Sequence, residues 1–494
     1  MPLTIPDIPR EALLASLPFA LLALGGTVVA LLGAWRSRWG VWAAFIALLA
    51  AGASLSPHLG APSSLHFWDG ALLADRFGAF LTLLLLAAGI HTLFLSETVL
   101  RREGKVRAEY YALLLYALSG MVLLVSTTNL LLLFLALELT SIPLYVLCGF
   151  HRGDSKGGEA ALKYFLLGSF SSAILLFGAA LLYGATGELD LAAMRGGGAL
   201  GAAGLLLVLT GLFFKAAVVP FHMWAPDAYD GAPTPITSFM ATAVKVASFG
   251  VLIRVFSSAG GVGPAAGLMG RPASEGMLFW LAVLTMTVGN LCALTQNNIK
   301  RMLAYSSIAH AGYALIGLVP GSGGPDAAGV LYYLTAYLLM TGGAFAVVTV
   351  LSRRDRWGET VQIDRFAGVG YRAPFLGAAM TVFLVSLGGI PPTAGFFGKY
   401  LIFRGALDRG LTALVVIAVL NSAASLYYYL RVVVFFYMRS TDRPAEIDPS
   451  RALRFIAVVG LVLVLWFGFG PDLGGVPGVP SLLGWIESAA ASLP

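Results

Sequence analysis

The sequence contains about fourteen apolar stretches, each close to the length of about 20 residues that an α-helix needs to cross a bilayer. Of the 494 residues, 58% are hydrophobic and 11% are charged, and the mean hydropathy is +0.84, far from the range of soluble domains. We therefore predict an all-α polytopic membrane protein. The stretches lie at residues 12–33, 39–56, 77–97, 109–126, 129–150, 159–184, 199–219, 232–257, 277–295, 302–320, 328–351, 373–407, 410–438 and 452–471.

Basic residues gather in alternate connections between these stretches. The connection after the third stretch alone holds Arg101, Arg102, Lys105 and Arg107, whereas the connections on the other side hold few. This asymmetry is the positive-inside rule, and it predicts that both termini lie outside. Abundant Ala, Gly, Leu and Arg indicate a GC-rich bacterial genome, so the outside is expected to be the periplasmic side of a bacterial inner membrane. The rule also accounts for the net charge of +6, so no nucleic-acid partner is expected. The first stretch has no small-residue cleavage site after it and is interpreted as a helix.

No cofactor or metal site is expected within this chain. The longest hydrophilic connection, residues 352–372, is too short to bury a core of its own. The two cysteines, Cys148 and Cys292, stand singly in apolar surroundings, which excludes an iron–sulfur cluster or structural zinc built by this chain alone. A G-x-G-x-x-G match at Gly196–Gly201 opens a membrane helix and follows no strand, so we interpret it as chance.

Four of the seven lysines, Lys163, Lys215, Lys245 and Lys399, lie inside the apolar stretches. A lysine at the centre of a spanning helix costs about 2.5–3.5 kcal/mol, so four together cost roughly 10–14 kcal/mol before compensation. A buried ammonium can give up its proton, whereas a guanidinium does not. This placement predicts a path for protons.

The four lysines differ in depth. Lys245 and Lys399 lie deep in their stretches, so their head groups cannot easily reach the membrane surface. Lys215 lies near one end of its stretch and Lys163 only five residues into its own, so snorkelling is an alternative for both. Two arginines near the ends of stretches are expected to snorkel, Arg254 and Arg431.

Glu138 is the only carboxylate well inside a stretch, and Ser141 three residues later shares its helix face. A Glu–Lys pair at about 4 Å gains on the order of 4 kcal/mol at an effective dielectric near 20. Moving a proton against 150–200 mV costs roughly 3.5–4.6 kcal/mol, which is similar. Making or breaking one such contact would therefore load or release a proton; a static buried ion pair is the alternative. His222 and His310 are possible relays, or are merely hydrogen-bonded.

Two stretches are broken beside a lysine. The seventh ends with Lys215 and Pro220, and the twelfth carries Gly389, Pro391 and Pro392 before Lys399. Broken helices are tolerated at membrane depth only where freed backbone groups face protein or a wet cavity. Because the breaks lie five helices apart, helices 4–8 and helices 9–13 are predicted to form two inverted five-helix repeats. A short match between the breaks points the same way: Phe213-Phe214-Lys215 and Phe396-Phe397-Gly398-Lys399.

The predicted organisation has four parts. Residues 1–108 form an N-terminal three-helix segment, 109–257 the first repeat and 277–438 the second repeat, and 452–494 a C-terminal helix followed by a short Gly/Pro-rich tail.

The sequence around the breaks resembles the antiporter-like membrane subunits of respiratory complex I, NADH-quinone oxidoreductase. Within them it is most similar to the subunit N family, over about residues 75–440. Subunit M typically has glutamate where Lys399 stands, and subunit L has a long lateral helix for which this chain has no room. The motifs that carry the resemblance are Phe213-Phe214-Lys215-Ala216-Ala217-Val218-Val219-Pro220-Phe221-His222-Met223-Trp224-Ala225-Pro226-Asp227, Gly231-Ala232-Pro233-Thr234-Pro235 with Lys245, and Gly389-Ile390-Pro391-Pro392-Thr393-Ala394-Gly395-Phe396-Phe397-Gly398-Lys399.

The resemblance implies proton translocation by this subunit, driven by quinone reduction elsewhere in a translocase. It implies Glu138 as the partner of Lys215, Lys245 as the central relay and Lys399 as the site near the exit, and it supports roles for Lys163, His222 and His310. NADH, FMN, the iron–sulfur clusters and quinone would belong to partner subunits. The lipid bilayer, subunit M and the small subunits J and K would be neighbours.

Two other classes of function share some of these features. A multi-subunit cation/proton antiporter or an energy-converting hydrogenase would have the same lysines and broken helices, although the sequence around Pro391 and Pro392 argues against them. A non-pumping scaffold would use the buried charges only to hold helices and subunits together.

Overall fold

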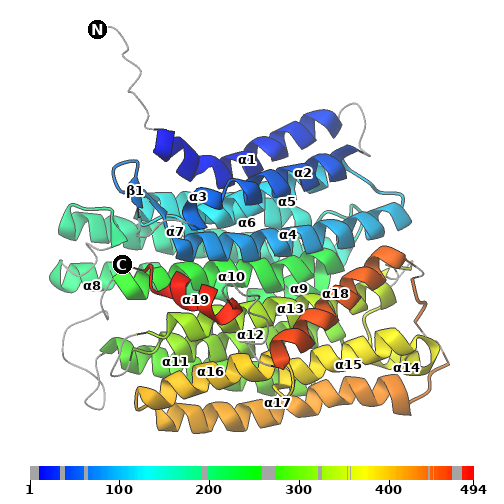
Figure 1. Cartoon of the computed structure of the whole chain (residues 1–494). Helices are drawn as coiled ribbons and strands as arrows, with labels where there is room; N and C mark the ends of the chain where they lie inside the picture. The colour runs from blue at the N-terminus through cyan, green and yellow to red at the C-terminus, as the bar shows by residue number, and fades with distance from the viewer. Residues whose placement is uncertain are drawn as a thin grey trace.

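The structure is a computed structural model that describes residues 10–33, 39–59, 65–191, 197–258, 273–320, 325–352, 354–355, 358–442, 445–448, 450–469 and 481–493. Its helices run side by side as one bundle (Figure 1). Within the described residues, the strands form two short antiparallel hairpins. We call the end of the bundle where α1 begins the first end, and the opposite end the second end.

The N-terminal segment supplies three long helices on one side of the bundle. Asp75 caps the last of them, accepting a hydrogen bond from the Gly78 N–H at 2.7 Å. The elements are α1 (Arg10–Gly33), α2 (Gly40–Ala53), the short α3 (Ser56–Leu59), the hairpin β1 (Leu65–Phe67) and β2 (Leu72–Ala74), and α4 (Arg76–Arg102).

The next group of helices contains the first break. Its elements are α5 (Ala108–Val125), α6 (Leu130–Cys148), α7 (Ser155–Thr186), α8 (Gly198–Ala216), the short α9 (Trp224–Gly231) after the break, and α10 (Thr234–Ser258).

The second group repeats this plan and contains the second break. Its elements are α11 (Ala273–Leu294), α12 (Ile299–Leu318), α13 (Ala327–Leu351), α15 (Pro374–Gly388) and α16 (Ala394–Asp408) on either side of the break, and α17 (Thr412–Met438). The connection after α13 holds β3 (Arg354–Asp355), β4 (Gly358–Glu359), the 3-10 turn η5 (Ile363–Phe366) and α14 (Val369–Arg372). The chain ends with α18 (Arg451–Gly468) and α19 (Leu482–Ala490).

The expected membrane fold is confirmed. Among the described residues, eleven helices are individually long and apolar enough to cross a membrane. Together with α2, α12 and the two-part α15–α16, they give the fourteen crossings expected from sequence. The apolar run 373–407, too long for one straight helix, is indeed divided in two.

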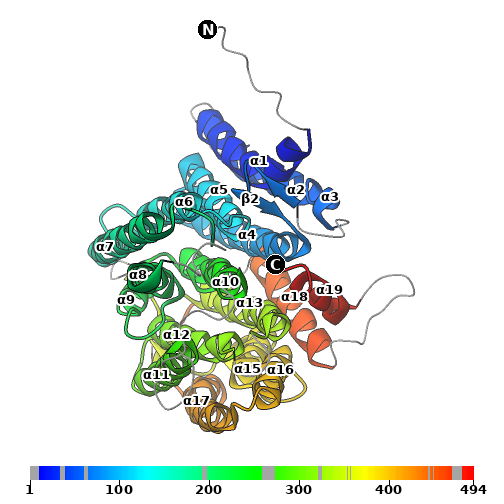
Figure 2. The same cartoon turned by 90° about the vertical axis from the view of Figure 1, so that its left-hand side faces the viewer.

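Two helices form the centre of the bundle (Figure 2). All of the apolar window of α10 and 94% of that of α13 are buried inside the protein, compared with 33% for α7 and for α17 at the outside. Polar groups on α10 and α13 are therefore shielded from lipid on every side, which makes these helices suitable carriers of buried charges.

The two groups of helices are inverted copies of each other. In each, an asparagine caps the second helix: Asn129 accepts from two backbone N–H groups of α6, and Asn298 accepts from two of α12. Each asparagine also pairs with the chain that leaves the third helix, at Asp190 in the first copy and Gln362 in the second. Asn129 lies at the first end of the bundle and Asn298 at the second end. The predicted inverted repeat is therefore confirmed.

The two breaks are also equivalent, but the two lysines beside them are not. The first helix half ends at a left-handed residue, Ala217, and the second also ends at a left-handed residue, Gly389. Lys215 precedes its break, whereas Lys399 follows its own. The short Phe-Phe-Lys match is therefore wrong as a repeat alignment, and the position equivalent to Lys399 is Asp227.

Arg254 is wrongly predicted to snorkel. It is fully buried (0% exposed) and makes two hydrogen bonds of 2.8 Å to the carboxylate of Asp75, itself 1% exposed. Its Nε donates to the Val125 carbonyl at 2.7 Å. This pair ties α10 to the N-terminal segment. Arg431 does lie near a helix end, where it donates to the carbonyls of Leu294 and Gln296.

The C-terminal region contains a helix that the Gly/Pro-rich composition does not predict. α19 begins at the Ser481 cap and is tied to α4, because Arg76 donates to Ser488 Oγ at 2.8 Å and the Phe77 N–H donates to Ser492 Oγ at 3.0 Å. Residues 470–480 and Gly196, the first residue of the G-x-G-x-x-G match, lie outside the described residues.

Candidate functional site: buried lysines across two repeats

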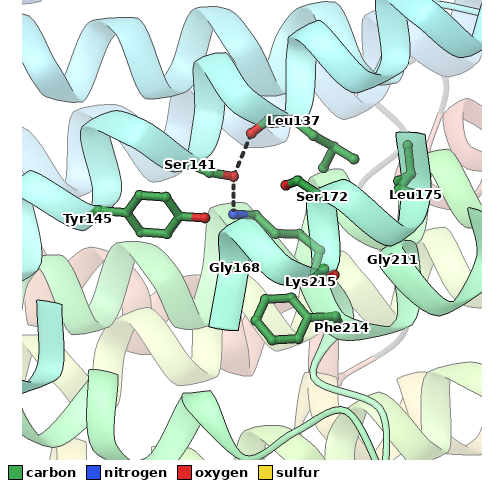
Figure 3. Close-up of a pocket in the computed structure, with 10 residues that line it drawn as sticks. Leu137, Ser141, Tyr145, Gly168, Ser172, Leu175, Gly211, Phe214 and Lys215 are labelled. Carbon is green, nitrogen blue, oxygen red and sulfur yellow. Dashed lines mark hydrogen bonds between the residues drawn. The ribbon is translucent and has the colours of Figure 1, made fainter. Parts of the chain in front are cut away.

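Lys215 lies in the last turn of α8, before the first break, and is 6% exposed. Its Nζ donates to Ser141 Oγ at 2.8 Å (Figure 3). It also donates to the Tyr164 hydroxyl at 3.0 Å. The ammonium also lies 5.3 Å from the centre of the Tyr164 ring. Both partners are hydroxyl groups, which can accept a hydrogen bond or donate one. The site therefore suits an ammonium group and a neutral amine.

Glu138 lies on α6, one turn before Ser141, and is half-buried. Its Oε1 is shielded from solvent and has no hydrogen-bond partner in the part of the chain that the structure describes. The expected contact between Glu138 and Lys215 is not formed in this structure, because the Lys215 Nζ donates its hydrogen bonds to Ser141 and Tyr164 instead. A carboxylate oxygen left unpaired one helix turn from Ser141, which itself binds the lysine, is positioned to exchange with the hydroxyl partners.

A small cavity beside Lys215 is lined by further hydroxyl groups. It has a volume of about 10 Å³, close to the space of one water molecule. Ser171 and Ser172 of α7 line it, and Figure 3 shows the Tyr145 hydroxyl directed toward the Lys215 Nζ. A water here would give the lysine a third partner.

Lys245 lies near the middle of α10 and is 3% exposed. Its Nζ donates to the backbone carbonyl of Ser307, on α12 of the second repeat, at 2.6 Å. One acceptor leaves two of the three N–H groups of an ammonium unsatisfied, so a neutral amine fits this place better. Lys245 thus links the two repeats directly.

His310 lies one turn after Ser307 on α12 and is 2% exposed. Its Nδ1 lies 2.6 Å from the Tyr333 hydroxyl and its Nε2 lies 3.2 Å from the Tyr429 hydroxyl. Because each hydroxyl can donate or accept, either neutral tautomer of the imidazole is satisfied. The sequence indicated His310 but not its two tyrosine partners.

Lys399 lies on α16 after the second break and is 4% exposed. Its Nζ donates to the carbonyls of Leu387 and Gly388, both at 3.0 Å, and to Ser422 Oγ at 2.8 Å. These carbonyls belong to the last turn of α15, where the break removes their helical partners. Three acceptors match the three N–H groups of an ammonium. A cavity of about 550 Å³ between α16 and α17 reaches this lysine.

Lys163 is not buried with the others. Its side chain is 45% exposed and forms ion pairs with Glu159 at 2.6 Å and with Asp227 at 2.9 Å. Asp227 also accepts a hydrogen bond of 2.6 Å from Arg301 of α12. Sequence reasoning missed Asp227, although it stands in the motif after the first break. His222 lies in the break itself, half-buried, and its buried Nδ1 has no hydrogen-bond partner within the described segments.

An ion pair fixes the connection after α13 to the second end of the bundle. Lys300 donates to Glu359 at 2.8 Å, and Glu359 also accepts hydrogen bonds from the Thr234 hydroxyl and N–H at 2.8 and 3.3 Å. Burial alone would raise the pKa of the Glu359 carboxyl, but the Lys300 charge and these hydrogen bonds hold it below its usual range. Glu359 therefore stays ionised at neutral pH and clamps the starts of α10 and α12 together.

Neither cysteine belongs to this polar system. Cys148 is buried, and its thiol donates to the sulfur of Met240 at 3.5 Å, in keeping with a packing role. Within the described ranges, no group of three or more His, Cys, Asp or Glu side chains is placed to hold a metal ion.

Comparison with known proteins gives one consistent family. Residues 127–425 match the profile described as NADH:quinone oxidoreductase/Mrp antiporter, TM. NADH-quinone oxidoreductase subunit N of Salinibacter ruber is 45% identical, over 88% of this chain and 87% of its own length. The same subunit of Myxococcus xanthus is 40% identical over 99% of both chains.

A solved structure agrees with these relatives. A chain of respiratory complex I from Thermus thermophilus, solved with bound aureothin, is 41% identical and superposes with a TM-score of 0.79, covering 92% of this chain and 98% of that one. Family profile, relatives and fold all coincide over the two repeats that hold the buried lysines. The chain belongs to the NADH-quinone oxidoreductase subunit N family of antiporter-like membrane subunits.

Proposed function

We propose that this protein is a proton-translocating subunit of NADH-quinone oxidoreductase. The observation that carries the proposal is the burial of Lys215, Lys245 and Lys399, between 3% and 6% exposed, with only neutral hydrogen-bond acceptors. Lysines this deep in a membrane protein are costly and mark ion paths. None of the three makes an ion pair in the described structure, so each is able to change its charge without breaking one.

The first step of the proposed mechanism is an exchange at Lys215. When Glu138 turns toward Lys215, the ion pair favours the ammonium and a proton is taken up. When Glu138 turns away, the hydroxyl groups of Ser141 and Tyr164 remain as partners, and they also satisfy a neutral amine. Quinone reduction in a partner subunit would drive this exchange by changing the charge near Glu138.

The second step carries the proton into the second repeat. Lys245 receives it, because its single acceptor, the Ser307 carbonyl, leaves the amine able to exchange. His310 lies one turn further along α12 and is held between two tyrosine hydroxyls, which makes it a relay toward Lys399. Lys399 would hold the proton before its release. His222, in the first break, and Lys163, at the second end, are proposed to serve proton entry.

The assembly and its surroundings belong to the same proposal. The relatives are named as subunits of an oxidoreductase complex, and we infer that this chain joins such a complex in a bacterial inner membrane. The first end, with both termini, would face the periplasm. NADH, FMN, iron–sulfur clusters and quinone would be bound by partner subunits, and subunits M, J and K would be neighbours.

The repeats also define the proposed division of the chain. We assign residues 1–108 to an N-terminal segment, 109–257 and 277–438 to the two repeats, and 452–494 to a C-terminal part. The hydrogen bonds of Asn129 and Asn298 support this division, because they recur at the same place in each repeat.

The test is NADH-driven proton uptake, measured together with NADH oxidation in vesicles that carry Lys215→Met, after a native gel has shown that the complex assembles. We expect the assembled variant to lose most of both activities. Normal rates of both would make Lys215 structural and favour the scaffold. Cation/proton exchange without NADH in the wild type would instead favour an independent antiporter, whose fold and lysines would be the same.

A further inference from the structure

A second large cavity is lined by none of the buried lysines. It is a crevice of about 570 Å³ between α4, α13 and α18. Its lining is apolar except for His91, and side chains such as Phe455 and Val459 are 67% and 40% exposed beside it. A volume of this size is typical of ligand sites rather than of packing defects.

Two glycines on α13 form the floor of the crevice. A Cβ atom on Gly343 would come within 2.3 Å of the Phe383 ring, so nothing larger than glycine fits there. A Cβ atom on Gly342 would lie 3.4 Å from the His91 ring. The Nε2 atom of His91 is shielded and has no hydrogen-bond partner among the described residues. The crevice is therefore built into the helix packing.

The length of the crevice matches one leaflet of a bilayer. Its lining on α18 runs from Ala452, next to the start of the helix, to Leu463. At 1.5 Å per residue this distance is about 16 Å. Half of the hydrocarbon core of a bilayer is about 15 Å. A groove that begins at the polar boundary and ends near the membrane centre has the dimensions of one acyl chain.

The mouth of the crevice is basic. Arg101 lies seven residues after the lining residue Phe94 on α4, and Arg451 lies four residues before Phe455 on α18, so both share the faces that line it. The side chain of Arg451 is exposed and makes no hydrogen bond or ion pair with the described residues. An unpaired guanidinium group at the polar boundary of the bilayer attracts phosphate.

Acidic groups at the mouth neutralise only part of this charge. Glu97 pairs with Arg101, whose side chain is 62% exposed, and Asp448 pairs with Arg102 at 2.8 Å. Two carboxylates thus face two arginines, and the exposed Arg451 of α18 remains as excess positive charge. Basic groups beside an apolar groove are the pattern of a site for an anionic lipid.

We propose that this crevice holds one acyl chain of an anionic phospholipid, with the phosphate bound by Arg451. The lipid fills the space between the C-terminal helix α18, the N-terminal segment at α4 and the central helix α13. Since α13 also carries Tyr333, the partner of His310, the lipid supports the face opposite the proton relay. The site is distinct from the proposed proton path and does not depend on it.

The test uses the whole complex, purified and reconstituted into vesicles of phosphatidylethanolamine and phosphatidylglycerol. One of the two lipids at a time carries a photoreactive diazirine in the middle of an acyl chain, and labelled peptides are mapped by mass spectrometry. We expect phosphatidylglycerol to label peptides of α4, α13 and α18 about fivefold more than phosphatidylethanolamine. Replacing the arginine at the mouth, Arg451→Gln, should make the two lipids equal.

A matched pair of variants separates the crevice from the general lipid shell. Ala87→Trp fills the crevice from α4 and should abolish the labelling, whereas Val458→Trp, on an exposed part of α18 outside the lining, should leave it unchanged. Equal labelling by both lipids in the wild type would overturn the proposal, and so would labelling that survives Ala87→Trp. If Ala87→Trp does not assemble, the lipid comparison in wild type and in the arginine variant decides. Stronger labelling by a photoreactive quinone would show that the occupant is a quinone instead.

Discussion

The lysine of the first repeat and the lysine of the second repeat sit in different chemical surroundings. Lys215 donates to two hydroxyl groups, and the unpaired carboxylate oxygen of Glu138 lies one helix turn from one of them, Ser141. Lys399 donates to two backbone carbonyls and one hydroxyl group, and no carboxylate is bonded to it. A hydroxyl can donate or accept, but a carbonyl can only accept. The first site therefore tolerates both protonation states, and the second favours the ammonium.

This difference teaches how an inverted repeat can give two unlike sites. The breaks are equivalent, but Lys215 precedes its break and Lys399 follows its own. A lysine after the break reaches back to the carbonyls that the break exposes. A lysine before the break cannot do so, and it uses side chains from α6 and α7 instead. We expect the first site to load protons and the second to hold them.

The largest effect is expected at the link between the sites. Lys245→Met keeps the length of the side chain and removes the group that donates to the Ser307 carbonyl. The assembled variant should lose proton uptake and NADH oxidation by about tenfold or more, because a methionine side chain has no group that can carry a proton between the two repeats. Lys105→Met, at an exposed lysine outside the spans, is the control and should keep normal rates. Normal rates in Lys245→Met would mean that the two sites are not connected through this residue.

A smaller effect is expected at the carboxylate that only the first site has. Glu138→Gln keeps the shape of the side chain but removes its charge, so Lys215 loses the partner that favours proton uptake. We expect a loss of about fivefold in proton uptake, since a charged hydrogen bond is worth roughly twice a neutral one. The measurement is the initial rate of uptake on NADH addition. An unchanged rate would show that the open contact between Glu138 and Lys215 never closes during turnover.

Two serine variants compare the sites directly. Ser141→Ala removes one of two hydrogen bonds of Lys215, whereas Ser422→Ala leaves Lys399 with both of its carbonyls. A hydrogen bond contributes about 1 kcal/mol, so Ser141→Ala should slow proton uptake by about threefold to fivefold. Ser422→Ala should slow it by less than about twofold. The reverse order would contradict the division into a loading site and a holding site.

The smallest effect is expected at Lys163. Its side chain is 45% exposed, and exposed ion pairs contribute little. Lys163→Gln should therefore lower proton uptake by about twofold at most. Asp227→Asn, which breaks the bond to Arg301 as well, should be the more damaging of the two. A severe loss in Lys163→Gln, with assembly intact on a native gel, would place this lysine on the main path.

Much of the fold follows from local sequence patterns. Apolar length alone predicts the fourteen crossings. Gly389 and Pro392 predict the second break, because glycine and proline do not continue a helix. α19 is missed because the Gly/Pro-rich stretch before it dominates the composition of the tail. Burial of Lys245 and Lys399 is also predictable from their distance to the ends of the spans, whereas Lys215 lies near the end of its stretch and the sequence leaves snorkelling open for it.

Long-range partners are what the sequence does not reveal. In the sequence Arg254 lies near the end of its stretch and is expected to snorkel. Its actual partner, Asp75, lies 179 residues away in the chain. Likewise the partners of His310 come from α13 and α17, and those of Lys215 from α6 and α7. Tyrosines in apolar stretches were a usable signal for these partners, since a buried hydroxyl needs a hydrogen bond. Which lysine each would meet depends on helix packing.

The most direct test of the account is Lys399→Arg, measured as NADH-driven proton uptake per NADH oxidised in the assembled complex. The adjoining cavity of about 550 Å³ gives the larger guanidinium room, so the variant keeps the positive charge without needing a new space. A guanidinium does not release its proton in a protein. The account predicts that proton uptake falls severely although the charge remains. Full pumping by Lys399→Arg would contradict it, because charge alone, and not proton transfer, would then be what the buried lysine supplies.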